Sequence, residues 1–223
     1  MSDNRQDGSP STDRRGFLGR AAAASAALGV AATTTGLREA LASPVQAPSA
    51  ADSWLKGLKG KYRQVFDAHD PNDGFGLAYA HTFLATQGSN PDAGAVVVLR
   101  HAGFVLALGD AAWSKYKIGQ TLNVVDPSTK APAIRNPFFR PSPGVLLADD
   151  MAIDRLLARG VLFGGCNVAL NVLSGKLAGN AGVTADVALK DWTAAVIPGV
   201  VIIPSGVWGV NRAQVAGCTY CVG

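Results

Sequence analysis

Two uninterrupted apolar runs, at residues 95–99 and 200–203, do most to limit what this chain can fold into. A strand with one face in water alternates apolar and polar residues. A run that is apolar at every position is typical of a strand buried on both faces, as in a parallel sheet covered by helices. The two runs therefore favour an α/β fold.

Strand and helix signals alternate along the rest of the chain. Leu77, Ala80, Phe83 and Leu84, for example, follow helical spacing. Because strands that alternate with helices pair in parallel through right-handed crossovers, we predict a three-layer α/β sandwich with a mainly parallel sheet of about five strands. The expected strands are 62–66, 95–99, 161–163, 200–203 and 218–222, and the expected helices are 75–87, 102–113, 149–159, 167–173, 186–193 and 206–216. Five prolines interrupt residues 115–144, which we interpret as a long ordered excursion over the surface.

The N-terminus has the pattern of a twin-arginine signal. Arg14-Arg15 is followed by Phe17-Leu18, then by a weakly apolar run at 21–32 and a small-x-small cleavage site at 40–42. The alternative is a basic N-terminus with a chance arginine pair. We predict a signal peptide at 1–42, a linker at 43–55 and one domain at 56–223, which the twin-arginine machinery exports to the periplasm or the cell exterior.

Composition limits the partners of the mature chain. The 42-residue leader holds five of the 20 Lys and Arg residues and four of the 16 Asp and Glu residues, which leaves a net charge of +3. This charge is too mild to indicate nucleic-acid binding. The mature part has no apolar run of the roughly 20 residues that a membrane span needs, so we expect no permanent membrane anchor.

Cys166 is the strongest candidate for chemistry. It follows an expected strand and precedes an expected helix, where ligand sites of parallel sheets lie and where the helix dipole favours a thiolate. The alternative is an inert buried cysteine. His101 follows the run at 95–99 and could act as a base or ion-pair partner of Cys166. We expect Gly165, Asn167 and Ser205 to form the ligand-binding surroundings.

Two other groups could carry chemistry. Cys218 and Cys221 form a CxxC, a possible redox pair, but residues three apart in a strand lie about 10 Å apart on opposite faces. A disulfide needs Cα atoms within about 7 Å, so the pair can bridge only if the tail turns back. A four-ligand zinc site would need more Cys or His nearby, so we assign no metal ligands and favour a structural role of the tail over a redox or metal role. The polar residues Asp67, His69, Asp70 and Asp73 could hold a hard metal or a polar substrate, although such a run is more often a solvated turn.

Several motifs together resemble the DsrE/DsrF-like family of sulfur-relay proteins. They are the run at 160–167 with its Gly-Gly-Cys-Asn, the run at 200–207 with its Pro-Ser-Gly-Val, and the closing Gln214, Gly217 and Tyr220. The resemblance implies a flavodoxin-like sheet, a trimer or hexamer, and a cysteine that carries sulfur as a persulfide, which is Cys166 here. It implies no other cofactor. Export argues against the cytoplasmic role of such proteins in tRNA thiolation.

Three functions remain open from the sequence. The first is an exported protein that carries sulfane sulfur on Cys166. The second is a non-catalytic ligand-binding or assembly module of the same fold. The third is a redox or metal protein that uses Cys218 and Cys221.

Overall fold

The structure, a computed structural model, describes residues 52–88 and 90–223. The signal at 1–42 and most of the expected linker lie outside these residues. The described part contains a five-stranded, all-parallel sheet in the order β4-β3-β2-β1-β5. The strands are β1 (Tyr62–Ala68), β2 (Ala93–Leu99), β3 (Leu162–Cys166), β4 (Val200–Ile203) and β5 (Thr219–Val222). All five expected strands are confirmed.

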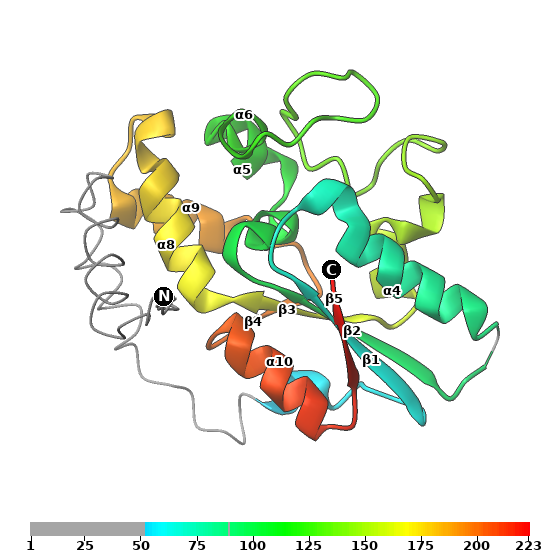
Figure 1. The fold of residues 1–223 in the computed structure, drawn as a ribbon. Helices are drawn as coiled ribbons and strands as arrows, with labels where there is room; N and C mark the ends of the chain where they lie inside the picture. The colour runs from blue at the N-terminus through cyan, green and yellow to red at the C-terminus, as the bar shows by residue number, and fades with distance from the viewer. Residues whose placement is uncertain (1–51, 89) are drawn as a thin grey trace, which may run out of the picture.

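Helices cover both faces of the sheet, so the three-layer α/β sandwich is also confirmed (Figure 1). The α-helices are α4 (Phe75–Thr86), α5 (Asp110–Lys115), α6 (Ile118–Leu122), α7 (Ile153–Ala158), α8 (Asn167–Leu177), α9 (Ala185–Ala194) and α10 (Gly206–Val215). The 3₁₀ segments are η1 (Asp52–Leu55), η2 (Asn72–Gly74), η3 (His101–Ala107), η4 (Asp149–Met151) and η5 (Ala178–Ala181).

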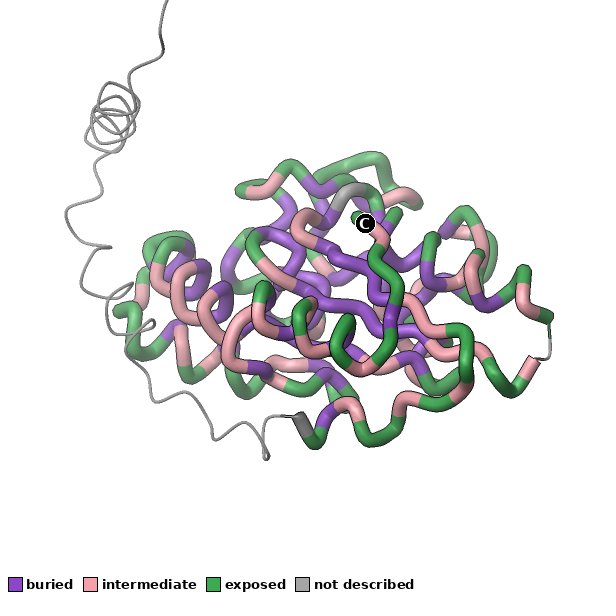
Figure 2. The backbone as a smooth tube through the Cα atoms, turned by 60° about the horizontal axis from the view of Figure 1, so that its bottom comes forward, coloured by how far each residue is buried: buried purple, intermediate pink, exposed green. Residues whose placement is uncertain are grey.

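Strand β2 separates two hydrophobic cores. Its Val97 and Leu99 side chains belong to the larger core beneath α4, η3 and α8, whereas Val96 and Val98 belong to the smaller core beneath α10. All four residues are fully buried, and Figure 2 shows the buried strands at the centre of the molecule. The uninterrupted apolar run at 95–99 is therefore explained by burial on both faces.

The order of the strands determines which helix lies on which face. Strands β1 to β4 are added one after another in one direction, and β5 then pairs with the other side of β1. The flavodoxin order reverses earlier, after its second strand. A reversal sends the crossover helix to the opposite face, because crossovers of parallel strands keep one hand. Accordingly, α10 lies on the opposite face from α4 (Figure 1).

The N-terminal end of the described chain is packed into the smaller core. Trp54 is 6% exposed, and a Cβ atom at Gly164 would lie 2.9 Å from its ring. Glycine at this position of β3 therefore leaves the space that the indole occupies. Trp54 falls within the range 43–55 that we expected to be a linker, so packed structure begins before residue 56.

Two expected helices are interrupted. The range 102–113 forms η3 and α5, and the range 149–159 forms η4 and α7. In the first case the chain approaches the end of β1 too closely for an α-helix to run on regularly. A Cβ atom at Gly103 would lie 2.3 Å from the carbonyl oxygen of Ala68, and the Gly103 amide donates to the carbonyl of His69 over 3.0 Å.

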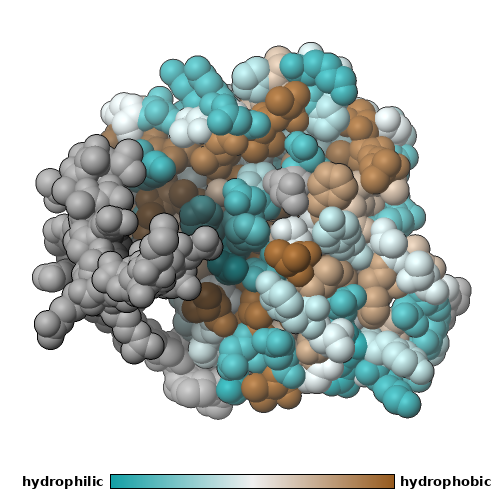
Figure 3. Space-filling view, viewed as in Figure 1, coloured by the Kyte–Doolittle hydropathy of each residue, from teal (hydrophilic) through white to brown (hydrophobic). Residues whose placement is uncertain are grey.

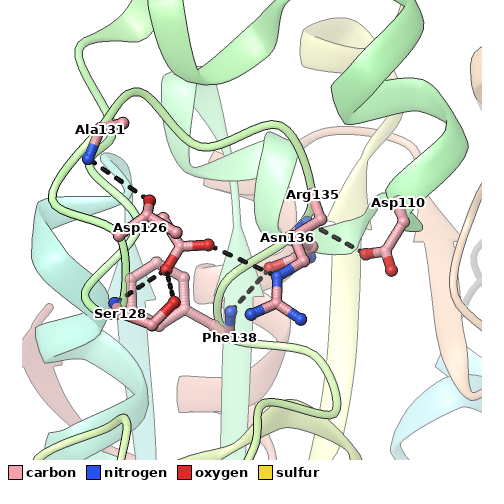
Figure 4. A network of polar contacts seen from close by, with 8 residues as sticks. Asp110, Asp126, Ser128, Ala131, Arg135, Asn136 and Phe138 are labelled. Carbon is pink, nitrogen blue, oxygen red and sulfur yellow. Dashed lines mark hydrogen bonds and ion pairs between the residues drawn. The ribbon is translucent and has the colours of Figure 1, made fainter.

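The excursion at 115–144 contributes to the interior, which corrects the expectation that it runs over the surface. Ile118 and Phe138 are 0% and 2% exposed. Buried Asn136 fastens the segment: its Nδ2 donates to the carbonyls of Leu106 and Leu108, each over 2.9 Å. Its Oδ1 accepts from the amide of Phe138 (Figure 4). The prolines that indicated a loop say nothing about burial, and tertiary hydrogen bonds hold this loop in place.

A second polar group stabilises the same excursion. Asp126, only 3% exposed, accepts from the amide and hydroxyl of Ser128 and from Nε of Arg135 (Figure 4). Burial alone would raise the pKa of Asp126, but the hydrogen bonds from Ser128 and Arg135 outweigh it and hold that pKa below its usual value.

No helix in the described ranges is long and apolar enough to cross a membrane. On the face shown in Figure 3, hydrophobic and hydrophilic residues are interspersed.

The lowered pKa of Asp126 predicts a pH-dependent stability. A carboxylate whose pKa is depressed in the folded state stabilises the fold above the unfolded pKa of about 4, and this stabilisation is lost as the pH falls through the folded pKa. Asp126→Asn should lower the free energy of unfolding by about 1–3 kcal/mol at pH 7 and by clearly less at pH 3. Urea denaturation at both pH values measures the difference. Asp150→Asn, at an exposed carboxylate, is the control and should have little effect at either pH; equal losses for Asp126→Asn at both would contradict the assignment.

Candidate functional site

The ends of β3 and β4 form a point where the chain leaves the sheet in two directions. Cys166 ends β3 and pairs with Ile203 at the end of β4. From β3 the chain enters α8, which packs on the larger core, and from β4 it enters α10 on the opposite face. Ser205, two residues beyond β4, is the N-cap of α10. In parallel sheets, ligands bind beyond the carboxyl ends of strands at such a divergence.

Cys166 is held at the N-terminus of α8. Its side chain is the N-cap: Sγ accepts a hydrogen bond from the backbone amide of Ala169 over 3.3 Å. Cys166 is 5% exposed, and Asn167, the first residue of α8, is partly buried. Gly165 packs against the ring of Phe104, from which an added Cβ atom would lie 3.2 Å away. The sulfur thus lies where the partial positive charge of the helix favours an anion.

At the ends of β1 and β2 lies an ion pair, between Asp67 and Arg100, that the sequence alone does not predict. Arg100 follows β2 and donates from Nε and Nη2 to the two carboxylate oxygens of Asp67 on β1, over 2.6 and 2.8 Å. Tyr220 on β5 donates its hydroxyl to the same carboxylate over 3.0 Å. Asp67 is 3% exposed, so a buried charge is satisfied by three hydrogen bonds.

This pairing keeps Arg100 charged and fixes its direction. The hydrogen bond to Asp67 raises the pKa of Arg100 above its ordinary value, and partial burial opposes that rise only in part. The pKa of Tyr220 is also raised, first by burial and then by its bond to Asp67. A forked, two-bond contact leaves the guanidinium little freedom to turn.

Arg100 and Cys166 lie at the carboxyl ends of two neighbouring strands, β2 and β3. Leu99, the last residue of β2, pairs with Gly165 of β3, and Arg100 and Cys166 are the residues that follow them. An ionised Cys166 would raise the pKa of Arg100 further, so the two groups are within electrostatic reach. The side chain of Arg100 also packs on the start of α10, where a Cβ atom at Gly206 would lie 2.3 Å from that of Arg100. Only glycine fits there.

A signal for this ion pair is present in the sequence, although it is weak. Asp67 and Arg100 each interrupt or end an apolar strand on the side that faces α10, where a lone charge would be expensive to bury. Tyr220 has a sequence signal only through the family resemblance. The partners are 33 and 153 positions apart along the chain, so only the strand order brings them together.

Ser205 serves its own helix. Its hydroxyl oxygen accepts from the amide of Trp208 over 3.2 Å, as expected for an N-cap. Ser205 is partly exposed, and it lies two residues beyond Ile203, which pairs with Cys166. The contact of its hydroxyl is to the helix that it caps, and a ligand-binding role of Ser205 stays a prediction.

His101 lies just beyond the end of β2, as expected. It begins η3 with a φ of 49° and its residue is exposed. Among the described residues no hydrogen bond joins His101 to Cys166. Arg100, one residue earlier, is the cation within electrostatic reach of the sulfur.

The polar residues after β1 separate into two groups. Asp67 binds Arg100, whereas His69, Asp70 and Asp73 line a pocket of about 410 Å³ together with Asn123. Nε2 of His69 lies 3.5 Å from Oδ2 of Asp70. In the ranges that the structure describes, no group of three or more His, Cys, Asp or Glu side chains could hold a metal ion.

Cys218 and Cys221 are both free thiols. Cys218 is buried in the smaller core, and Cys221 on β5 packs against the larger one, so the two side chains are on opposite faces of the sheet. Burial raises the pKa of Cys218 to about 11, despite the nearby charge of Arg63. A disulfide between the two would still require the end of the chain to turn back.

Comparison with known proteins adds no relative. No protein-family model matches the chain, and no curated protein matches it. The DsrE/DsrF-like resemblance, the twin-arginine leader and the trimer or hexamer therefore stay predictions from the sequence.

The raised pKa of Cys218 predicts that the thiols of the CxxC differ in reactivity. At pH 8, Cys218 should react with iodoacetamide at least about a hundredfold more slowly than Cys221, because few of its thiols are ionised and the side chain is buried. Peptide mass spectrometry of timed samples measures both rates. In denaturant the two rates should become similar. Comparable rates in the folded protein would contradict the assigned burial of Cys218.

Proposed function

We propose that this chain is an exported, DsrE-like protein that accepts sulfane sulfur on Cys166 and carries it as a persulfide. The observation that supports this most directly is the hydrogen bond from the Ala169 amide to Sγ of Cys166, which gives the sulfur a donor at the N-terminus of an eleven-residue helix. Such a position stabilises an anionic sulfur, whether thiolate or persulfide.

The chemical step is a displacement at sulfur. The thiolate of Cys166 attacks a sulfane sulfur of an inorganic polysulfide, and a new S–S bond forms. The S–S bond to the rest of the polysulfide breaks, and the shortened chain leaves with the electron pair. The proton of the original thiol passes to solvent. No external oxidant or reductant is needed, because the donor already holds sulfur at the required oxidation level.

The surroundings of the other thiols support the choice of Cys166. Cys218 lies in an apolar core, with its pKa raised to about 11. The sulfur of Cys221 donates to the neighbouring carbonyl of Val222. Cys166 alone of the three caps a helix N-terminus. The proposal assigns no role to His101.

Sulfur loading can be measured on the mature protein. After incubation with inorganic polysulfide and removal of excess donor, intact mass should show one added sulfur atom on the wild type, and peptide analysis should place it on Cys166. Cys166→Ser should lose this adduct, whereas Cys218→Ser and Cys221→Ser should keep it. A wild-type protein that gains no sulfur, or gains it equally in Cys166→Ser, would overturn the proposal.

Export is the second part of the proposal, and it rests on the sequence of the leader. Replacing both signal arginines, Arg14→Lys with Arg15→Lys, should leave unprocessed precursor inside the cell, because the twin-arginine pair is the address that the machinery reads. Fractionation and N-terminal sequencing measure the outcome. Arg20→Lys, outside the pair, is the matched control and should be exported and processed. Export of the double variant at the wild-type level would contradict a twin-arginine route.

The pocket after β1 favours a second candidate function, a non-catalytic module that binds a small polar ligand. Its volume of about 410 Å³ and its polar lining by His69, Asp70, Asp73 and Asn123 suit such a ligand. Cys166 does not line this pocket, so the two functions are separable. Under the second function alone, Cys166→Ser would leave ligand binding intact and the wild type would gain no sulfur.

A further inference from the structure

We propose that Arg100 is the specificity-determining residue of the Cys166 site, selecting anionic sulfur donors over neutral ones, and that Asp67 and Tyr220 position its guanidinium. This inference rests on the proposed function, because it concerns the donor that Cys166 accepts. It can nevertheless be tested separately through anion binding.

The geometry leaves one edge of the guanidinium available. Two of its nitrogens, Nε and Nη2, are used by Asp67. Among the described residues, Nη1 has no hydrogen-bond partner. The Arg100 side chain is 30% exposed, while the Asp67 side chain is 4% exposed. A ligand can therefore reach Arg100 from outside while Asp67 holds it from within.

The position of the free edge is fixed by contacts on several sides. The register of β2 and β3 sets Arg100 beside Cys166. Gly206 at the start of α10 packs on its aliphatic part, since an added Cβ atom would lie 2.3 Å away. Tyr220 donates to the carboxylate that Arg100 grips. The Arg100 guanidinium is therefore a cation within electrostatic reach of the sulfur, and its orientation is already fixed before a donor arrives.

The positive charge of Arg100 favours anionic sulfur donors. Thiosulfate is a dianion, and a thiolate that attacks it meets like charge. The guanidinium offsets that repulsion and can donate to the departing oxygens in a planar, two-bond geometry. In the step, the Cys166 thiolate bonds to the sulfane sulfur, the S–S bond of thiosulfate breaks, and sulfite leaves with the electron pair. A neutral organic trisulfide gains little from the cation.

The experiment compares sulfur loading of Cys166 from thiosulfate and from a neutral dialkyl trisulfide, by peptide mass spectrometry at matched ionic strength. Arg100→Gln should load from thiosulfate about ten- to hundredfold more slowly, the effect of losing one charged hydrogen bond, and from the trisulfide within about twofold of wild type. Arg100→Lys, which keeps the charge but not the fork, should fall between. Tyr220→Phe should slow only thiosulfate loading, by a few-fold.

Matched controls separate positioning from general damage to the fold. Arg135→Gln breaks another ion pair of an arginine with a buried aspartate, Asp126, in the excursion, and should leave the ratio of the two loading rates unchanged. Because Arg100→Gln leaves Asp67 buried without its cation, the double variant Asp67→Asn with Arg100→Gln is included; it should fold better and show the same loss of preference. Circular dichroism checks the fold of each variant.

Sulfate, which transfers no sulfur, provides the separate test of anion binding. It should slow alkylation of Cys166 by iodoacetamide in the wild type, relative to chloride at equal ionic strength, but not in Arg100→Gln. If the wild type accepts sulfur from neither donor while this protection holds, the sulfur-carrier function fails and the anion site stands. Equal protection in both proteins, protection in neither, or equal slowing with both donors would overturn the role of Arg100.

Discussion

Burial of the central strand on both faces is the constraint on which the rest of this structure depends. Val96, Val97, Val98 and Leu99 are fully enclosed, so no polar side chain can be accommodated along β2 until the strand ends. Ionisable groups are expensive to bury away from water or a partner. Chemistry is therefore displaced to the carboxyl edge of the sheet, where Arg100 follows directly.

The Asp67–Arg100 ion pair marks the boundary between that apolar interior and the edge. Asp67 is nearly as buried as the valines around it, and Arg100 and Tyr220 donate hydrogen bonds to its carboxylate, which offset part of the cost of burying it. A buried ion pair contributes little net stability, but it fixes the orientation of both side chains, because breaking it would leave one charge buried without a partner. It joins β1, β2 and β5 at the level where β3 presents Cys166.

The sequence was sufficient for the sheet because each strand carries its own signal. A run such as 200–203 is apolar whatever surrounds it, and the structure has β4 at those residues. The 3₁₀ segment at His101–Ala107 could not be predicted in the same way, because its form follows from the contact of Gly103 with the end of β1. The spacing of apolar residues predicts which face of a helix is buried, but it does not predict how closely the backbone of another segment approaches that helix.

In the candidate site, too, local features could be predicted from the sequence, whereas contacts between distant residues could not. Cys166 could be found from the sequence because a strand–glycine–cysteine–helix junction is local, and the structure gives it the helix-capping bond that such a junction permits. Its neighbours could not, because their partnership is a matter of register. His101 directly follows the run at 95–99, which makes it a natural candidate from the sequence, yet the residue before it, Arg100, is the one that packs on α10 and lies within electrostatic reach of Cys166. A shift of one residue reverses which side of a strand a side chain occupies.

The three cysteine thiols have different surroundings, so their reactivities can be measured separately. Cys218 is in the smaller core and Cys221 packs on the opposite face of the sheet. Cys166 belongs to the larger core, but it caps the N-terminus of α8 and lies within electrostatic reach of Arg100. Charge selects between them, because an anionic reagent gains from Arg100 only at Cys166, while a neutral reagent gains at none. The ratio of anionic to neutral reactivity at each cysteine is thus a more direct measure of the site than the absolute rate, which burial lowers at Cys166 and Cys218 alike.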